Sequence, residues 1–199
     1  MTPVMTKTMI LATRNKGKLR EFNHAFEGTG IEFQSLLEMD GAPDPEETGE
    51  TYEDNALIKA RQIALHTGMA TVADDSGIEI DALPGELGVK SARVWGGMAY
   101  DKINDILLER LRGSTTRSTR YVCAIAYVDP ATGVEELVKA TCEGVIHDRQ
   151  EGAGGFGYDP IFFVPQFGKT MAQLPLETKN RISHRAKAME LLKEKLIRS

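Results

Sequence analysis

The order of apolar and polar positions along the chain predicts alternating strands and helices. Short apolar or alternating runs predict strands at residues 9–12, 70–73, 78–82, 120–128, 134–146 and 161–164. Apolar positions at helical spacing predict helices at residues 19–26, 51–68, 103–111 and 183–196. This order is typical of an α/β fold. Since no repeat or linker divides the chain, we expect a single domain over residues 1–199.

Two helix starts have a capping residue. Thr51, followed three residues later by Asp54, predicts a capping box, and Ser183 is expected to cap the last helix. The two long strands flank Asp129-Pro130-Ala-Thr-Gly133, which is a hairpin signal.

Composition narrows the class of protein. The 199 residues contain 24 Lys and Arg against 29 Asp and Glu, a formal charge of −5, without a basic block. This excludes a partner such as a nucleic-acid polymer, which requires clustered cations. The N-terminal residues hold no long apolar run, so we expect no signal peptide, no membrane helix and a cytoplasmic protein. Cys123 and Cys142 lack metal-ligand spacing and are expected to be buried free thiols.

A polar segment separates the first predicted strand from the first predicted helix. It contains Thr13, Asn15, Lys16 and Lys18, which carry hydroxyl, amide and ammonium donors. A helix N-terminus adds unpaired N–H groups and a positive dipole end, so this segment is a candidate phosphate site. The alternative interpretation is a solvated basic turn.

Two acidic pairs are candidate ligands for a hard cation. Glu46 and Glu47 lie in an acidic loop, whereas Asp74 and Asp75 come directly after an apolar strand. Carboxylates from two distant segments can hold one Mg²⁺ between them. Adjacent strand residues point to opposite faces, so the two aspartates are expected to have different roles. For the glutamates, the alternative is a solvated loop.

The glycine-rich segment 152–160 imitates a dinucleotide-binding fingerprint, but a polar stretch precedes it and a strand follows, so we reject that interpretation. Gly168-Lys169-Thr170 also imitates a phosphate-binding loop, but Phe163 replaces the required glycine. What remains is a glycine run that exposes Phe156, either to stack on a nucleobase or to fill the core.

Cations gather at residues 179–185, at the start of the last predicted helix. Cations are unfavourable at the positive end of a helix, so their presence suggests an anionic or carbonyl-bearing partner. The alternative is that Arg181 and Arg185 only face solvent.

Together these segments resemble the inosine/xanthosine triphosphate pyrophosphatase family over nearly the whole chain. The motifs that carry the resemblance are Thr13-x-Asn15-x-x-Lys18, Glu47-Thr48-Gly49, Glu53-x-Asn55-Ala-x-x-Lys59-Ala-Arg61, Ala73-Asp74-Asp75-Ser76-Gly77, Ser91-Ala-Arg93, Gly155-Phe-Gly-Tyr-Asp-Pro160 and Ser183-His184-Arg185. The resemblance implies a long mixed β-sheet with helices in two lobes and an active-site cleft between them. It also implies a homodimer and Mg²⁺-dependent hydrolysis of ITP, dITP and XTP to the monophosphate and pyrophosphate, which removes non-standard purines from the nucleotide pool.

The resemblance also implies a role for each matching residue. Glu47 and Asp75 become metal ligands, and Asp75 is also the general base. The residues implied to bind the nucleotide are Thr13, Arg14, Asn15, Lys16, Gly17, Lys18, Lys59, Ser76, Phe156, Gly157, Tyr158, Asp159, Lys179, His184 and Arg185. Donors from Arg185, His184 or N–H groups near Phe156 would meet the 6-keto oxygen of the base. Two alternatives are a related pyrophosphatase with another base preference and a nucleotide sensor that does not hydrolyse its ligand.

Overall fold

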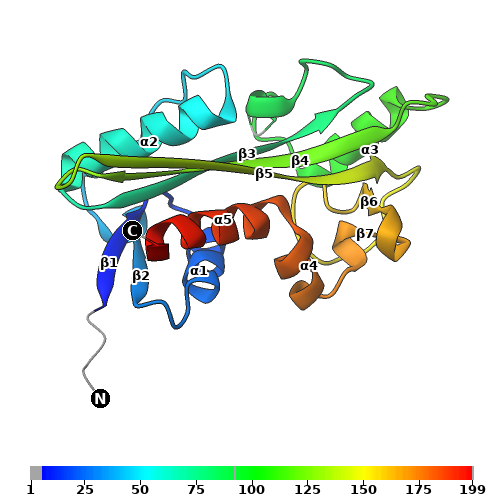
Figure 1. Cartoon of the computed structure of the whole chain (residues 1–199). Helices are drawn as coiled ribbons and strands as arrows, with labels where there is room; N and C mark the ends of the chain where they lie inside the picture. The colour runs from blue at the N-terminus through cyan, green and yellow to red at the C-terminus, as the bar shows by residue number, and fades with distance from the viewer. Residues whose placement is uncertain (1–5, 92, 199) are drawn as a thin grey trace. The chain divides into compact units, whose positions relative to one another are not determined.

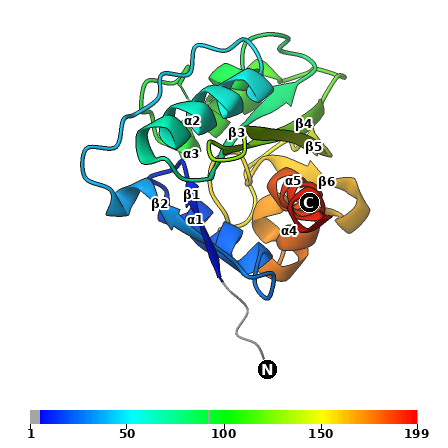
Figure 2. The same cartoon turned by 60° about the vertical axis from the view of Figure 1, so that its left-hand side comes forward.

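The computed structural model describes residues 6–91 and 93–198; Ala92, in the Ser91-Ala-Arg93 motif, lies outside them (Figures 1 and 2). The α-helices are α1 (Lys16–Ala25), α2 (Tyr52–Thr67), α3 (Tyr100–Arg110), α4 (Leu176–Ile182) and α5 (His184–Arg198). The strands are β1 (Lys7–Leu11), β2 (Ile31–Ser35), β3 (Thr71–Ile80), β4 (Ser118–Asp129), β5 (Val134–Ile146), β6 (Phe162–Val164) and β7 (Lys169–Thr170).

The seven strands form one sheet in the order β2-β1-β3-β4-β5-β6-β7. β1 pairs in parallel with β2 and with β3, whereas β6 pairs antiparallel with β5 and with β7. The sheet is therefore mixed, which confirms the expected α/β class with a mixed central sheet.

The chain divides into two compact units. The first holds the described residues of 1–75, 123–139 and 188–199, and the second holds those of 76–122 and 140–187. Each is described separately below.

In the first unit, helices cover both faces of β5 (Figure 1). Oε1 of Glu53, in α2, lies 2.8 Å from Nζ of Lys139. Nζ of Lys195, in α5, lies 2.6 Å from Oε2 of Glu136. Residues 136 and 139 are an odd number apart, so their side chains point to opposite faces of the strand. The two ion pairs thus attach α2 to one face and the end of α5 to the other.

In the second unit, the core forms between α3 and the ends of the long strands. Ile103 and Leu107 of α3 pack in one cluster with Ile78, Tyr121 and Phe162, all at most 7% exposed. Burial of such side chains is the main stabilising contribution to a core of this kind.

The expected thiols are confirmed. Cys123 and Cys142 are both buried and free, and burial raises the pKa of Cys142, which keeps its thiol protonated and unreactive. The predicted caps are also confirmed. Thr51 and Asp54 form the capping box of α2, and Ser183 Oγ accepts the N–H of Ala186 in the first turn of α5. Within the described part of the chain, no helix is both long and apolar enough to span a bilayer.

One prediction about β3 is wrong. The segment Asp74-Asp75-Ser76-Gly77 was expected where one strand ends, but β3 continues through it from Thr71 to Ile80. β3 lies between β1 and β4 in the sheet, and lysine partners, described below, compensate the buried aspartates. Three of the strands and α-helices, β2, β7 and α4, were not predicted.

Candidate functional site

The polar segment before α1 is shaped by Asn15. Its Oδ1 accepts the N–H groups of Gly17 at 2.8 Å and Lys18 at 3.3 Å, and its own N–H donates to Thr13 Oγ1. The expectation that the N–H groups at this helix start are unpaired is therefore wrong for Gly17 and Lys18. Asn15 is the N-cap of α1, and the segment has a fixed conformation.

The cations of this segment point in different directions. Lys18 Nζ lies 2.8 Å from Asp74 Oδ1. Arg14 instead donates to the carbonyl oxygens of Leu36 at 3.3 Å and Ala42 at 2.8 Å, while Lys16 is exposed. Arg14 thus anchors the loop after β2, and Lys18 is the cation of this segment that pairs with Asp74.

Carboxylates from the acidic loop and from β3 meet at one lysine. Lys59 Nζ of α2 lies 2.5 Å from Glu47 Oε1 and 3.6 Å from Asp75 Oδ1. Asp75 is 7% exposed, and the Lys59 side chain is 13% exposed. The ion pairs of Asp74 and Asp75 are with different lysines, Lys18 and Lys59 respectively.

Asn55 is a component of this group that the sequence reasoning did not assign to the site. It is fully buried on α2, its Nδ2 donates to Asp75 Oδ2 at 3.1 Å, and its Oδ1 accepts the N–H of Gly49 at 2.8 Å. One amide therefore ties the acidic loop to β3. The signal for it was a polar residue beside the apolar positions Tyr52 and Ala56 of an amphipathic helix.

Burial and neighbouring charges shift the pKa values of this group. Burial raises the pKa of Asp75, the charge of Lys59 opposes that effect, and the charge of Glu47 adds to it; the pKa remains raised. For Lys59, burial lowers the pKa, but the charges of Asp74 and Asp75 together with the hydrogen bond and charge of Glu47 outweigh it, so the pKa is raised. Lys59 therefore stays protonated, and Asp75 binds a proton more readily than an ordinary aspartate.

Gly49 lies too close to α2 to carry a side chain. A Cβ at this position would lie 2.5 Å from Asp54 Cβ and 3.0 Å from the Asn55 nitrogen. We expect Gly49→Ala to displace the acidic loop, to lower the free energy of unfolding by about 1–3 kcal/mol, and to reduce any turnover at least about tenfold. Urea denaturation and kinetics measure the two effects. The neighbouring variant Glu50→Ala, at an exposed position, is the control and should match wild type.

The second unit holds another charged group, around Asp159. Asp159 is 7% exposed and its Oδ2 lies 2.7 Å from Lys179 Nζ. The same oxygen accepts the N–H of Phe156 at 3.2 Å, and Phe156 as a whole residue is 63% exposed. Of the two interpretations for Phe156, the core-filling one is wrong, because most of its surface remains exposed.

Gly155 makes this arrangement possible. Its φ of +81° is unfavourable for other residues, and a Cβ would lie 2.0 Å from Asp159 Oδ2 and 2.5 Å from Lys179 Nζ. The glycine run therefore allows the backbone to pass directly over an ion pair.

Gly157 and Tyr158, the next residues of the segment, are held in place by hydrogen bonds. Tyr158 Oη donates to the carbonyl oxygen of Ser91 at 2.7 Å and accepts from Trp95 Nε1 at 3.1 Å; burial raises the pKa of Tyr158 to about 12. The carbonyl oxygen of Gly157 accepts from Asn104 Nδ2 at 3.2 Å. Tyr158 thus anchors the loop and keeps its proton.

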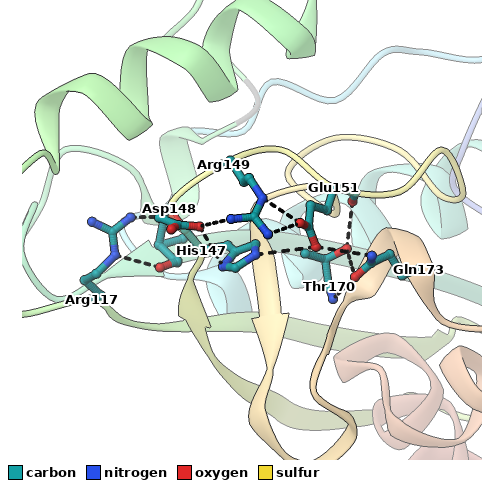
Figure 3. Close-up of polar contacts among 8 residues, drawn as sticks. Arg117, His147, Asp148, Arg149, Glu151, Thr170 and Gln173 are labelled. Carbon is teal, nitrogen blue, oxygen red and sulfur yellow. Dashed lines mark hydrogen bonds and ion pairs between the residues drawn. The ribbon is translucent and has the colours of Figure 1, made fainter.

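A polar network fixes the chain before the glycine run (Figure 3). Arg117 Nε donates to the carbonyl oxygen of Ile146 at 2.7 Å, and His147 lies between the carboxylates of Asp148 and Glu151. Glu151 also pairs with Arg149 at 2.5 Å, and its carbonyl oxygen accepts from Thr170 Oγ1 at 2.7 Å. These contacts give the segment that carries Phe156 a rigid starting point.

The cations near the last helix need a correction. Lys179 and Arg181 belong to the last turn of α4, where the negative end of the helix favours them, so only His184 and Arg185 stand at a helix start. Arg181 is exposed and pairs with Glu177 at 3.0 Å, whereas Arg185 is 6% exposed and donates to Ser76 Oγ at 3.4 Å. The solvent-facing alternative therefore holds for Arg181 and is wrong for Arg185.

Comparison with known proteins gives consistent matches. The sequence model of the Ham1 family matches residues 9–195. The chain is 47% identical to the dITP/XTP pyrophosphatase of Symbiobacterium thermophilum over 96% of this chain and 95% of that protein, and 46% identical to the dITP/XTP pyrophosphatase of Geobacillus kaustophilus over 94% and 93%. Its fold is similar to that of the Staphylococcus aureus Ham1 protein, with a TM-score of 0.87 and 39% identity over 96% of this chain and 98% of that one.

Proposed function

The chain belongs to the Ham1 family, and on this basis we propose that it is a nucleoside-triphosphate pyrophosphatase that hydrolyses dITP, ITP and XTP to the monophosphate and pyrophosphate. Its relatives, which are dITP/XTP pyrophosphatases by name, support the substrate class. The structural observation that carries the proposal is the meeting of Glu47 and Asp75 at Lys59. A protein that only bound a polyanion would have no electrostatic reason to bring two carboxylates together there.

The first unit binds the triphosphate in this proposal. Lys18 and Lys59 supply positive charge, and the segment of Thr13, Arg14, Asn15, Lys16 and Gly17 supplies polar donors around the phosphates. Since Arg14 is engaged with carbonyl oxygens, its contribution is to hold the neighbouring loop. Phosphoryl chemistry depends mostly on positioning and on neutralising charge, and these residues supply both.

Glu47 and Asp75 offer carboxylate oxygens, which are suitable ligands for a Mg²⁺ ion. Both are carboxylates, from distant segments, that already converge on one cation. No group of three or more His, Cys, Asp or Glu side chains in the described residues is arranged to hold a metal by itself. Mg²⁺ binds through one or two carboxylates and completes its coordination with waters and substrate phosphates. When bound, it neutralises the phosphate charge and polarises the phosphorus for attack.

Asp75 takes the proton of the attacking water in the proposed step. Its raised pKa makes it a stronger base than an ordinary aspartate, and the Asn55 amide fixes one of its oxygens. Lys59 keeps it ionised and oriented. Attack at the α-phosphorus then releases pyrophosphate and leaves the monophosphate.

The second unit selects the purine. The exposed ring of Phe156 is available for stacking on the base, and Asp159 with Lys179 forms a buried polar group beside it. Because the Phe156 N–H donates to Asp159, the donors for the 6-keto oxygen are His184 and Arg185, with Ser76 beside Arg185. A 6-amino group, as in adenine, leaves such a donor unpaired, at a cost of about 1–3 kcal/mol.

A substrate panel tests the function. We expect purified protein with Mg²⁺ to hydrolyse dITP, ITP and XTP with kcat/KM at least about tenfold above ATP, because of the unpaired donor described above. EDTA should abolish turnover. Chromatography should find monophosphate and pyrophosphate in equal amounts.

Three outcomes contradict the proposal. Orthophosphate as the only phosphate product rules out attack at the α-phosphorus. Preference for a pyrimidine triphosphate indicates the alternative pyrophosphatase, and tight ITP binding without turnover at any Mg²⁺ concentration indicates a sensor. The proposal also includes the cytoplasmic location and the homodimer that the family resemblance implies; sedimentation tests the latter.

A further inference from the structure

Tyr121 of β4 lies at the centre of the polar group of the second unit. It is 7% exposed, and its hydroxyl donates to Asp159 Oδ1 at 3.1 Å. Its ring stacks between Phe162, with centroids 4.2 Å apart, and His184, with centroids 4.8 Å apart. One buried side chain therefore contacts two residues assigned to the nucleotide.

The two oxygens of the Asp159 carboxylate have different partners. Tyr121 occupies Oδ1, whereas Lys179 and the Phe156 N–H occupy Oδ2. Burial raises the pKa of Tyr121 well above its usual value, so the hydroxyl keeps its proton and acts as a donor. With both oxygens engaged, the carboxylate has one orientation, and this fixes Lys179 and the backbone beneath the exposed Phe156 ring.

The ring of Tyr121 fixes His184 in the same way. The planes of the two rings are 22° apart, and Phe162 lies against the other face of Tyr121 at an interplanar angle of 13°. A stack that begins in the core cannot slide without disturbing the core. The imidazole at the first position of α5 is thus held in register with Asp159.

We infer that Tyr121 is a positioning residue for purine recognition, which holds Asp159 through its hydroxyl and His184 through its ring. This inference rests on the proposed function, and it adds a residue that touches neither the base nor the phosphates. This role could not be predicted from the sequence, because Tyr121 lies in an apolar strand, β4, where it looks like any other core residue.

The test separates base binding from phosphate binding. For Tyr121→Phe, which keeps the stack and removes the hydroxyl, we expect KM for ITP to rise about fivefold and the affinity for IMP to fall by the same factor, as for one lost hydrogen bond. We expect kcat to change less than about twofold and the affinity for pyrophosphate with Mg²⁺ to stay at its wild-type value, since neither depends on the base. Isothermal titration calorimetry measures both affinities.

Tyr127→Phe is the matched control. Tyr127 is in the same strand and buried, and its hydroxyl also donates to an aspartate, Asp129, at 3.1 Å, within the first unit. It should lose similar stability with no change in IMP affinity. Tyr121→Leu, which removes the ring as well, should reduce the preference for ITP over ATP further.

Two results would overturn the inference while the proposed function stands. One is wild-type IMP affinity in Tyr121→Phe; the other is an equal fall in IMP and pyrophosphate affinity, which indicates general structural damage. If wild type neither hydrolyses ITP nor binds IMP, the proposed function fails and the inference fails with it.

Discussion

Asp75→Asn should lower kcat for ITP by about 10²–10⁴-fold while the protein remains folded. General-base catalysis contributes a factor of this size, and asparagine keeps the shape of the side chain but cannot accept the proton. The change also removes a negative charge beside Glu47, so it relieves repulsion and leaves Lys59 one carboxylate partner. We therefore expect little loss of stability. Single-turnover kinetics and thermal unfolding check the two parts separately.

Asp129→Asn is the matched control for this variant. Asp129 is 8% exposed and pairs with Lys7 at 3.5 Å, so it is also an aspartate with a lysine partner in the first unit. Its replacement should leave kcat unchanged. Turnover of Asp75→Asn within about threefold of wild type would contradict the role of Asp75 as base.

The elements with strong periodicity were predictable from the sequence. Residues 134–146 form a strand over the expected range, and α2 begins at its predicted capping box. In β2, Phe33 and Ser35 are buried and the residue between them is exposed, which is the alternation of a strand. The strand has only five residues, so this alternation is too short to be recognised in the sequence. α4 has seven residues and none of them is buried, so it lacks an apolar face from which to predict it.

The candidate site was predictable as a set of residues but not as a set of contacts. The motifs identify Glu47, Lys59 and Asp75, but no spacing in the sequence says that one lysine contacts both acids. Arg14 shows the limit most clearly. It lies in the predicted phosphate segment, and its partners are backbone carbonyl oxygens, which carry no sequence signature.

Lys59→Met should produce the second large effect, a loss of both activity and stability. Methionine keeps the length of the side chain and removes the charge, which leaves Glu47 and Asp75 without their shared cation. Removing one partner of a fully buried pair costs about 3–5 kcal/mol; with 13% of the lysine side chain and 25% of the Glu47 side chain exposed, we expect about 1–3 kcal/mol. Loss of a preorganised positive charge near the phosphates should reduce kcat about 10²-fold. Lys139→Met, which breaks the more exposed pair with Glu53, is the control and should retain wild-type turnover.

The pH dependence of the same variant distinguishes its electrostatic effect from simple damage. In wild type, kcat/KM should fall as the pH drops through the pKa of Asp75, which burial places above the ordinary aspartate value. Lys59 lowers that pKa, so in Lys59→Met the pKa rises and the acid limb of the profile should move to higher pH.

The pKa shifts of Lys59 and Asp75 also determine how the stability of Lys59→Met depends on pH. The pKa of Lys59 is raised in the folded state, so its stabilising contribution is complete below the unfolded lysine pKa and is lost as the pH rises through the folded value. At neutral pH the variant therefore shows its full deficit. Without Lys59, Asp75 has a still higher pKa in the folded state than in the unfolded state, so protonation favours folding and the deficit should shrink as the pH falls through that value. An acid limb that stays at the wild-type pH, in a variant with reduced turnover, would show that Lys59 does not set the ionisation of Asp75.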